Sequence, residues 1–214
     1  MLLGPGRGFE IAQGRLGPGR IHHCMRTVGT AERALSALIF RARHRVAFKE
    51  RLDRKDTVRQ AIAEARIEIA KCRQLCYLAA CMCDVKGFKG ARQYIAMIKV
   101  AAPRMALKIV DEAMQVHGGH GVSQYSKLSD MWRQLRTIRI ADGPDIVHLN
   151  TVAKMEIARA AHHDAYGADI SGINPNIEKY GKYKHVRHLT HEGISKGVRA
   201  VEGTSASVPM PSKM

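Results

Sequence analysis

Apolar residues recur three and four positions apart through most of the first 165 residues, which is the spacing of one face of an α-helix. The clearest stripe predicts a helix over about 56–85 and steps through Val58, Ile62, Ala65, Ile69, Cys72, Cys76, Ala79 and Cys83. Similar stripes predict helices over about 22–48, 88–116, 124–133 and 144–164. Long helices joined by short loops favour an antiparallel four-helix bundle, so we expect an all-α fold.

Local signals refine two of these helices. Asp56 or Thr57 stands where a capping residue begins the helix over 56–85, and Gly87 follows its expected end. Pro103 lies inside the stripe over 88–116, and we expect it to kink that helix or to split it in two.

The two ends of the chain lack helical periodicity. Glycine is frequent in residues 1–20, where Phe9, Ile11 and Leu16 predict a short extended piece between turns. Residues 166–214 are rich in polar residues, proline and glycine, and we expect a weakly ordered tail. The last three residues, Ser212-Lys213-Met214, resemble the peroxisomal address Ser-Lys-Leu with its final residue changed.

Composition narrows the class of protein. The chain has 214 residues, 45% of them hydrophobic, with no apolar run long enough to span a bilayer, so we expect no integral membrane segment. Its five cysteines include Cys24 and a cluster at Cys72, Cys76, Cys81 and Cys83. The cluster contains no C-x-x-C and falls inside a helical pattern. We therefore interpret the cysteines as reduced, small core residues, and we expect no metal site.

The formal net charge of +16 is concentrated toward the N-terminal part, where residues 1–55 hold twelve Lys and Arg against four Asp and Glu. A basic surface suits an anionic partner, which could be a nucleic acid, a membrane surface or a phosphorylated small molecule. The alternative is a basic surface that serves only solubility.

The stretch Ala141-Asp142-Gly143-Pro144-Asp145 interrupts the pattern between the last two expected helices. From local pattern alone, Asp142 would cap the last helix, and Pro144 would fit its first turn, where a missing N–H is tolerated.

Four motifs change that interpretation, because they occur in the order and spacing typical of a known family. They are Gly8-Phe9-Glu10-Ile11-Ala12, Arg45-Val46-Ala47-Phe48, Gln115-Val116-His117-Gly118-Gly119-His120-Gly121 and the stretch at Asp142. The chain resembles the acyl-CoA dehydrogenase family over residues 1 to about 165. The run from Gly14 to Arg26 narrows the resemblance to one subgroup.

This resemblance implies a domain arrangement and an assembly. Residues 1–21 would be the end of the middle β-domain and a linker, which leaves a short β remnant at the N-terminus. Residues 22–165 would be the C-terminal helical domain, and residues 166–214 the tail. Members of the family form homodimers or homotetramers through this domain, with FAD between subunits, and act in mitochondria or peroxisomes.

The resemblance also implies a chemistry, the α,β-dehydrogenation of an acyl-CoA thioester in fatty acid β-oxidation. Asp142 matches the position of the catalytic base, which is usually a glutamate, and Arg20 matches an arginine that contacts the CoA portion. The positions that match FAD contacts are Arg45, Phe48, Gln115, Gly118, Gly119, Pro144 and Asp145.

Three hypotheses remain open at this point. The first is the C-terminal part of an FAD-dependent acyl-CoA dehydrogenase, which by itself would hold only part of a flavin site. The second is a non-catalytic module for oligomerisation or interaction. The third, from charge alone, is a basic helical protein that binds nucleic acid. No nucleic-acid motif accompanies the charge, so we expect no nucleic-acid partner.

Overall fold

The computed structural model describes residues 3–162, and the expected tail with Ser212-Lys213-Met214 lies outside them. The chain divides into two compact units, Met1–Met155 and Glu156–Met214. The bundle and the site residues discussed below belong to the first unit, and α6 extends across the boundary at Met155.

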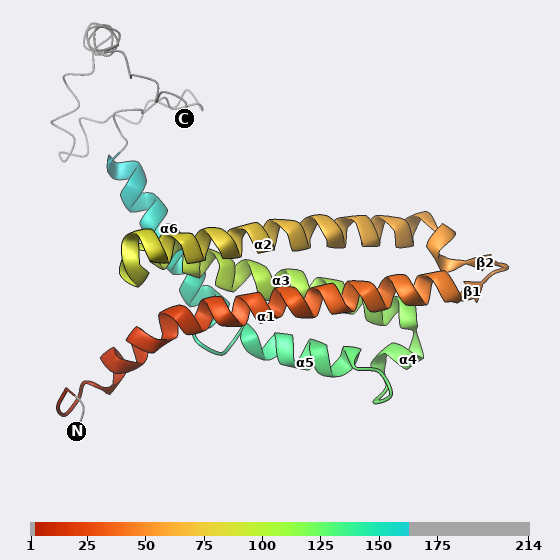
Figure 1. Ribbon diagram of the computed structural model, residues 1–214, viewed down its shortest axis with the longest axis horizontal. Coiled ribbons are helices and arrows are strands. Elements are labelled where there is room, and N and C mark those ends of the chain that lie inside the picture. The colour runs from red at the N-terminus through yellow and green to blue at the C-terminus, as the bar shows by residue number, and fades with distance from the viewer. Residues whose placement is uncertain (1–2, 163–214) are drawn as a thin grey trace, which may run out of the picture. The chain divides into compact units, whose positions relative to one another are not determined.

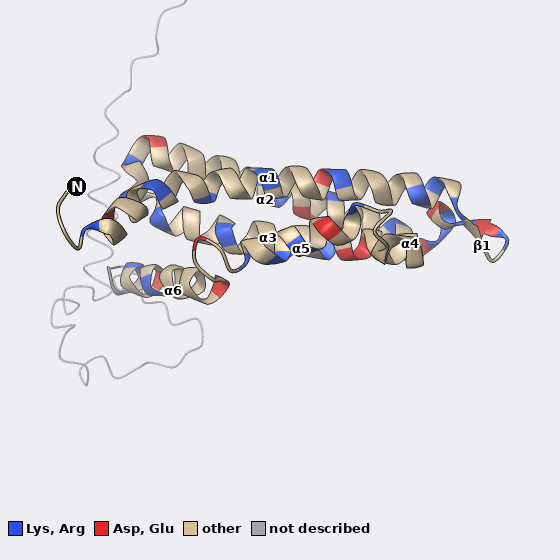
Figure 2. Cartoon of the chain, turned by 90° about the horizontal axis from the view of Figure 1, so that it is seen from below, with Lys and Arg blue, Asp and Glu red and all other residues tan. Residues whose placement is uncertain are grey.

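Four helices of the first unit form the bundle: α1 (Gly8–His44), α2 (Asp56–Gly90), α3 (Arg92–His117) and α5 (Leu128–Ile138). Successive helices run in opposite directions (Figure 1). In the view of Figure 2, α1 and α2 form the upper layer and α3 and α5 the lower one. The short connecting elements are the strands β1 (Val46–Ala47) and β2 (Glu50–Arg51), the 3-10 turn Leu52–Arg54 and the four-residue helix α4 (Gly119–Val122). The helix α6 (Asp145–His162) follows α5. The expected antiparallel four-helix bundle is therefore confirmed.

The core lies along α3, which contacts α1, α2 and α5. Buried residues of α1 step by three and four through Cys24, Thr27, Val28, Ala31, Ala34, Leu35, Leu38 and Ala42. On α3 the buried positions extend over more than one stripe, because this helix has neighbours on several sides. The many alanines at these positions allow the helix axes to approach closely.

Several expectations about the elements need correction. The extended piece and β remnant expected near the N-terminus are wrong, because α1 already begins at Gly8. Neither Asp56 nor Thr57 caps α2, since its capping position is Lys55 and no side chain bonds there. Gly87 does interrupt the helical geometry of α2, with φ 67°, but helical turns resume as far as Gly90. Pro103 does not split α3, which is a single helix.

Three of the five cysteines are core residues, as expected: Cys24, Cys72 and Cys76 are buried. Cys81 is exposed and Cys83 is half-buried, so the expectation is wrong for Cys81. All five are free thiols. Burial raises the pKa of Cys24 to about 12, so this thiol stays protonated and unreactive.

Lys and Arg are spread along α1, α2, α3 and α5, with acidic residues among them (Figure 2). Glu32 on α1 pairs with Arg66 and Arg73 on α2, and Glu64 on α2 pairs with Lys108 on α3 at 2.9 Å. Exposed pairs of this kind contribute little to stability, because water and salt screen the charges. None of the helices within residues 3–162 is long and apolar enough to cross a membrane.

Candidate active site

The turn between α5 and α6, residues 139–144, carries Asp142. Asp142 has φ 57° and Gly143 has φ 106°, so two successive residues are in the left-handed region. For a residue with a side chain this conformation costs on the order of 1 kcal/mol. Neighbouring elements must therefore hold the turn in place.

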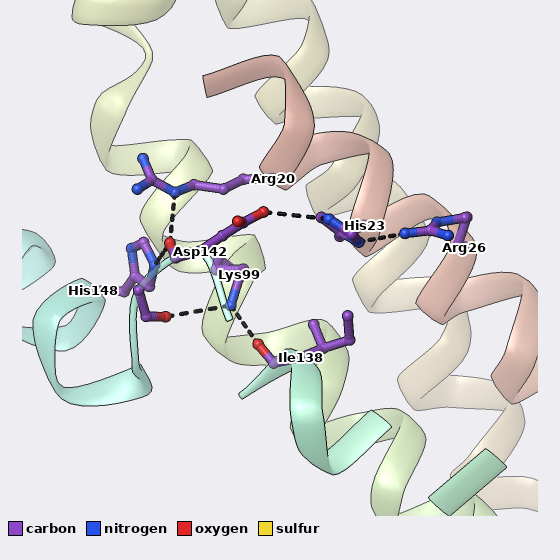
Figure 3. Close-up of polar contacts among 8 residues, drawn as sticks. Arg20, His23, Arg26, Lys99, Ile138, Asp142 and His148 are labelled. Atoms are coloured by element: carbon purple, nitrogen blue, oxygen red, sulfur yellow. Dashed lines mark hydrogen bonds and ion pairs between the residues drawn. The ribbon is translucent and has the colours of Figure 1, made fainter. Parts of the chain in front are cut away.

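Lys99 of α3 makes two of the holding contacts from inside the protein. The residue is only 1% exposed. Its Nζ donates to the carbonyl of Ile138 at 2.5 Å and to the carbonyl of Gly143 at 3.4 Å (Figure 3). Burial lowers the pKa of Lys99, while the nearby Asp142 and Asp145 act in the opposite direction. Lys99 thus links the end of α5, at Ile138, to Gly143 on the other side of Asp142.

Arg20 and His148 hold the backbone of Asp142 itself. Arg20 Nε, from α1, donates to the Asp142 carbonyl at 2.9 Å, and His148 Nε2, from α6, contacts the same oxygen at 3.3 Å. A carbonyl can only accept, so His148 carries its proton on Nε2. Burial is the main cause that lowers the pKa of both side chains. Three elements, α1, α3 and α6, therefore converge on one turn (Figure 3).

The carboxylate of Asp142 faces α1. Its Oδ2 lies 3.3 Å from His23 Nε2, within ion-pair distance, yet this buried oxygen has no hydrogen-bond partner among the described residues. Among residues 3–162, no hydrogen bond joins the Asp142 side chain to the first turn of α6, where the Val147 N–H donates to the Pro144 carbonyl at 3.0 Å. The local expectation that Asp142 caps α6 is therefore wrong, and its carboxylate is left for another role.

Asp145 is engaged in ion pairs inside the domain. Its Oδ2 accepts from Arg104 Nε at 3.0 Å and from Arg139 Nε at 2.8 Å, which links the start of α6 to α3 and to the end of α5. Burial alone would raise the pKa of Asp145, but the two arginines hold it below its usual value. Its Oδ1 is buried and has no hydrogen-bond partner within residues 3–162. Pro144, in the next position toward Asp142, is exposed.

The sequence-predicted cofactor loop lies at the end of α3. Gln115, Gly118 and Gly119 are all exposed. Gly118 has φ 63°, which favours glycine. A Cβ added at Gly118 or Gly119 would meet no atom within 4 Å. A ligand could thus approach this backbone closely, as the binding of a flavin nucleotide requires.

Arg45 and Phe48 lie at the hairpin that follows α1. Val46 pairs with Arg51 and Ala47 with Glu50, and Phe48 and Lys49 form the two-residue turn between them. Both turn residues have positive φ, at 54° and 65°. Phe48 is 95% exposed. A bulky aromatic side chain held in this conformation and directed into solvent is unusual for a residue with a purely structural role.

The structure brings together only some of the predicted site residues. Arg20, Asp142, Pro144 and Asp145 gather at the turn after α5. The loop at Gln115–Gly119 precedes the other end of α5, a helix about 16 Å long at the usual helical rise. The hairpin with Arg45 and Phe48 lies toward that same end of the bundle (Figure 1). One chain therefore holds its candidate base and most of its candidate cofactor contacts in separate places.

Sequence reasoning missed three residues of the turn's surroundings: His23, Lys99 and His148. Lys99 had a detectable signal, because it is the only charged residue in the apolar run from Ile95 to Pro103. A charge in the middle of a buried stripe needs specific partners. His23 and His148 gave no comparable signal. Residues 3–162 contain no group of three or more His, Cys, Asp or Glu able to hold a metal ion.

Residues 6–157 match the family described as acyl-CoA dehydrogenase, C-terminal domain. The match covers well over half of the chain and includes the Asp142 turn, the Gln115–Gly119 loop and the hairpin. The chain therefore belongs to the acyl-CoA dehydrogenase family, through its C-terminal helical domain.

The subgroup that the run from Gly14 to Arg26 indicates is that of members 10 and 11 of the family, and individual relatives confirm it. Acyl-CoA dehydrogenase family member 11 from Homo sapiens is 58% identical over 157 residues, which cover 73% of this chain and 20% of that protein. Acyl-CoA dehydrogenase family member 10 from Mus musculus is 51% identical over 157 residues, 73% of this chain and 15% of that protein. The solved structure of butyryl-CoA dehydrogenase from Megasphaera elsdenii has a TM-score of 0.65 at 28% identity and covers 71% of this chain and 39% of its own. The chain thus spans about a fifth of the length of the member 11 relatives.

Gly143→Ala tests the geometry of the turn. An added Cβ would lie 2.8 Å from His148 Nε2, and φ at this position is 106°. We expect the free energy of unfolding to fall by about 1–3 kcal/mol, measured by urea denaturation. Gly29→Ala is the matched control, because its Cβ would meet nothing within 4 Å inside α1. That variant should gain up to about 1 kcal/mol. Equal effects of the two substitutions would contradict the described turn.

The buried His148 predicts a loss of stability in mild acid. Its pKa is lowered in the folded state, first by burial and then by the charges of Lys99 and Arg20. The unfolded chain therefore binds more protons below the ordinary histidine value of about 6.5. The free energy of unfolding should fall as the pH drops from 7 toward 5, by at most about 1.4 kcal/mol per pH unit for one site.

The measurement is denaturation at several pH values between 5 and 7.5, for the original chain and for His148→Gln. Glutamine keeps an N–H for the Asp142 carbonyl but does not titrate. His148→Gln should have a visibly shallower slope. Identical slopes would show that His148 is not the group responsible. The ion pairs of Asp145 are lost in a separate, more acidic window, because its pKa is below the usual value.

Proposed function

We propose that this chain provides the general base and part of the cofactor-binding surface for FAD-dependent α,β-dehydrogenation of an acyl-CoA thioester. The observation that carries the proposal is the carboxylate of Asp142. It stands on a left-handed turn held by backbone contacts from Arg20, Lys99 and His148, and its Oδ2 has no hydrogen-bond partner among residues 3–162. A carboxylate that is firmly placed but not bonded is suited to take a proton.

In this proposal Asp142 removes the proton from the α-carbon of the thioester. Arg20, Lys99 and His148 fix the position of the base by bonding to the backbone on both sides of it, so that the shorter aspartate can reach as a glutamate would. FAD, when bound, supplies the acceptor for the hydride that leaves the β-carbon. Burial of the turn among α1, α3 and α6 limits access of water to the carboxylate.

The cofactor surface would consist of the exposed loop with Gln115, Gly118 and Gly119 and the hairpin with Arg45 and Phe48. The open backbone at the two glycines fits close approach of a nucleotide. A guanidinium such as that of Arg45 suits paired bonds to a pyrophosphate. This surface and the base of one chain lie apart, which fits a homodimer or homotetramer with FAD bound between subunits. Asp145 contributes through its ion pairs, which position the start of α6.

A second candidate function is a non-catalytic module for oligomerisation. The projecting Phe48 supports it, because an exposed aromatic side chain is a typical interface residue. The site of action that we propose for either function is the peroxisome or the mitochondrion.

The first test is the visible spectrum of the purified full chain with added FAD, followed by addition of an acyl-CoA. The proposal predicts bound flavin whose absorbance bleaches. Asp142→Asn should keep the flavin but slow the bleaching by at least about a hundredfold, since the amide cannot accept the proton. Unchanged bleaching would show that Asp142 is not the base. An oligomer that takes up no flavin would favour the interaction module.

A second test concerns the cofactor surface. Arg45→Ala should weaken FAD binding about tenfold or more, because a charge-assisted bond to phosphate is lost. Arg43→Ala is the matched control, since Arg43 is an exposed arginine in the last turn of the same helix. Binding is measured by the quenching of flavin fluorescence. Equal weakening by both variants would mean that only general positive charge matters, and would count against a specific role of Arg45.

A further inference from the structure

Three side chains form a line that ends at the carboxylate of Asp142. Arg26 Nη2 contacts His23 Nδ1, and His23 Nε2 lies 3.3 Å from Asp142 Oδ2 (Figure 3). Arg26 and His23 are three residues apart on α1 and therefore lie on one side of the helix. Among residues 3–162, only His23 lies within ion-pair distance of this carboxylate.

The chemistry of arginine decides which nitrogen of His23 carries the proton. A guanidinium has five donors and no acceptor. The contact with Arg26 therefore requires Nδ1 of His23 to accept. A neutral imidazole that accepts at Nδ1 has its single proton on Nε2. The Nε2 that carries this proton lies 3.3 Å from Asp142 Oδ2.

The surroundings of His23 keep the ring neutral. Burial lowers its pKa, the charge of Arg26 lowers it further, and His22 and Lys99 act in the same direction. Asp142 alone among these neighbours raises it. Near neutral pH the ring is therefore a neutral donor, and its contact with Asp142 does not neutralise the carboxylate.

The remaining donors around the turn are directed elsewhere. Arg20, Lys99 and His148 donate to backbone carbonyls of the turn or of α5. In the described part of the chain, the buried Oδ2 of Asp142 still lacks a hydrogen bond, although His23 Nε2 is only 3.3 Å away. Catalytic hydrogen bonds are often misaligned before substrate binds and tighten afterwards.

We propose that His23 is a positioning residue for Asp142, fixed by Arg26 as the neutral form with its proton on Nε2. Its N–H orients the carboxylate toward the substrate. This inference rests on the proposed function, in which Asp142 is the base. It assigns to α1 a role in the reaction beyond the backbone contact of Arg20.

The decisive experiment is a long-range ¹H–¹⁵N spectrum of the ¹⁵N-labelled full chain at pH 7.5, with His23 assigned by comparison with His23→Gln. The expected result is a protonated-type shift for Nε2 and an acceptor-type shift for Nδ1. A proton on Nδ1, or on both nitrogens, would overturn the proposal. The spectrum needs neither flavin nor activity, so failure of the proposed function cannot be confused with failure of this inference.

Two variants test whether Arg26 fixes the position of the proton on the His23 ring. In Arg26→Met, Nδ1 loses its donor, and the two nitrogen shifts of His23 should move toward averaged values as both neutral forms become populated. Arg33→Met is the matched control, because Arg33 is an exposed arginine of the same helix. It should leave the His23 shifts unchanged. Unchanged shifts in Arg26→Met would contradict the assignment.

Where flavin bleaching is observed, its rate in variants of His23 tests whether this residue assists Asp142. Glutamine offers one acceptor and one donor group, so His23→Gln should stay within about threefold of the original bleaching rate. Leucine offers neither, and His23→Leu should be slower by about tenfold or more with flavin binding unchanged. Equal rates for the two variants would exclude a positioning role for the Nε2 proton.

Discussion

The turn that carries Asp142 depends on the burial of the Lys99 ammonium. Removing such a charge from water costs several kcal/mol unless other groups solvate it. Ile138 is the last residue of α5, so its carbonyl belongs to the negative end of a helix dipole, where a cation is favoured. The Gly143 carbonyl supplies the second contact. The lysine therefore requires α5 to end where it does and the chain to fold back over it.

The side chains that hold the turn also determine the electrostatic surroundings of the candidate base, Asp142. Lys99, Arg20 and His148 approach the turn, but each of them bonds to a backbone carbonyl. A direct ion pair would hold the carboxylate charged and make it a weaker base. Bonds to the backbone fix the position of Asp142 without an ion pair to its carboxylate. A neutral histidine beside the carboxylate extends this arrangement, since it offers a hydrogen bond without adding a full positive charge.

The long helices could be predicted from the sequence because their stripes are regular and their cores are internal to one chain. Where tertiary contacts outweighed local preference, the prediction failed. Glycines make residues 8–20 poor helix formers, yet Gly17 is buried against Phe88, and a Cβ there would come within 3.3 Å of the ring. Close packing thus favours a helix that local propensity disfavours. The prediction that Asp142 caps the last helix failed for a similar reason. The local sequence carries no sign of the contact between its side chain and His23 of α1.

Motif resemblance predicted the candidate site residues as one set, but the fold places them at two separate positions. The Gln115–Gly119 loop precedes α5 and the Asp142 turn follows it, so the length of that helix lies between them. An enzyme that uses both must bring different chains, or further parts of a longer chain, to one flavin. The oligomerisation module would use the same exposed hairpin and loop, so that surface alone cannot distinguish the two functions. The difference lies at the Asp142 turn, because a module that only assembles has no need for a strained aspartate whose turn is held by Arg20, Lys99 and His148.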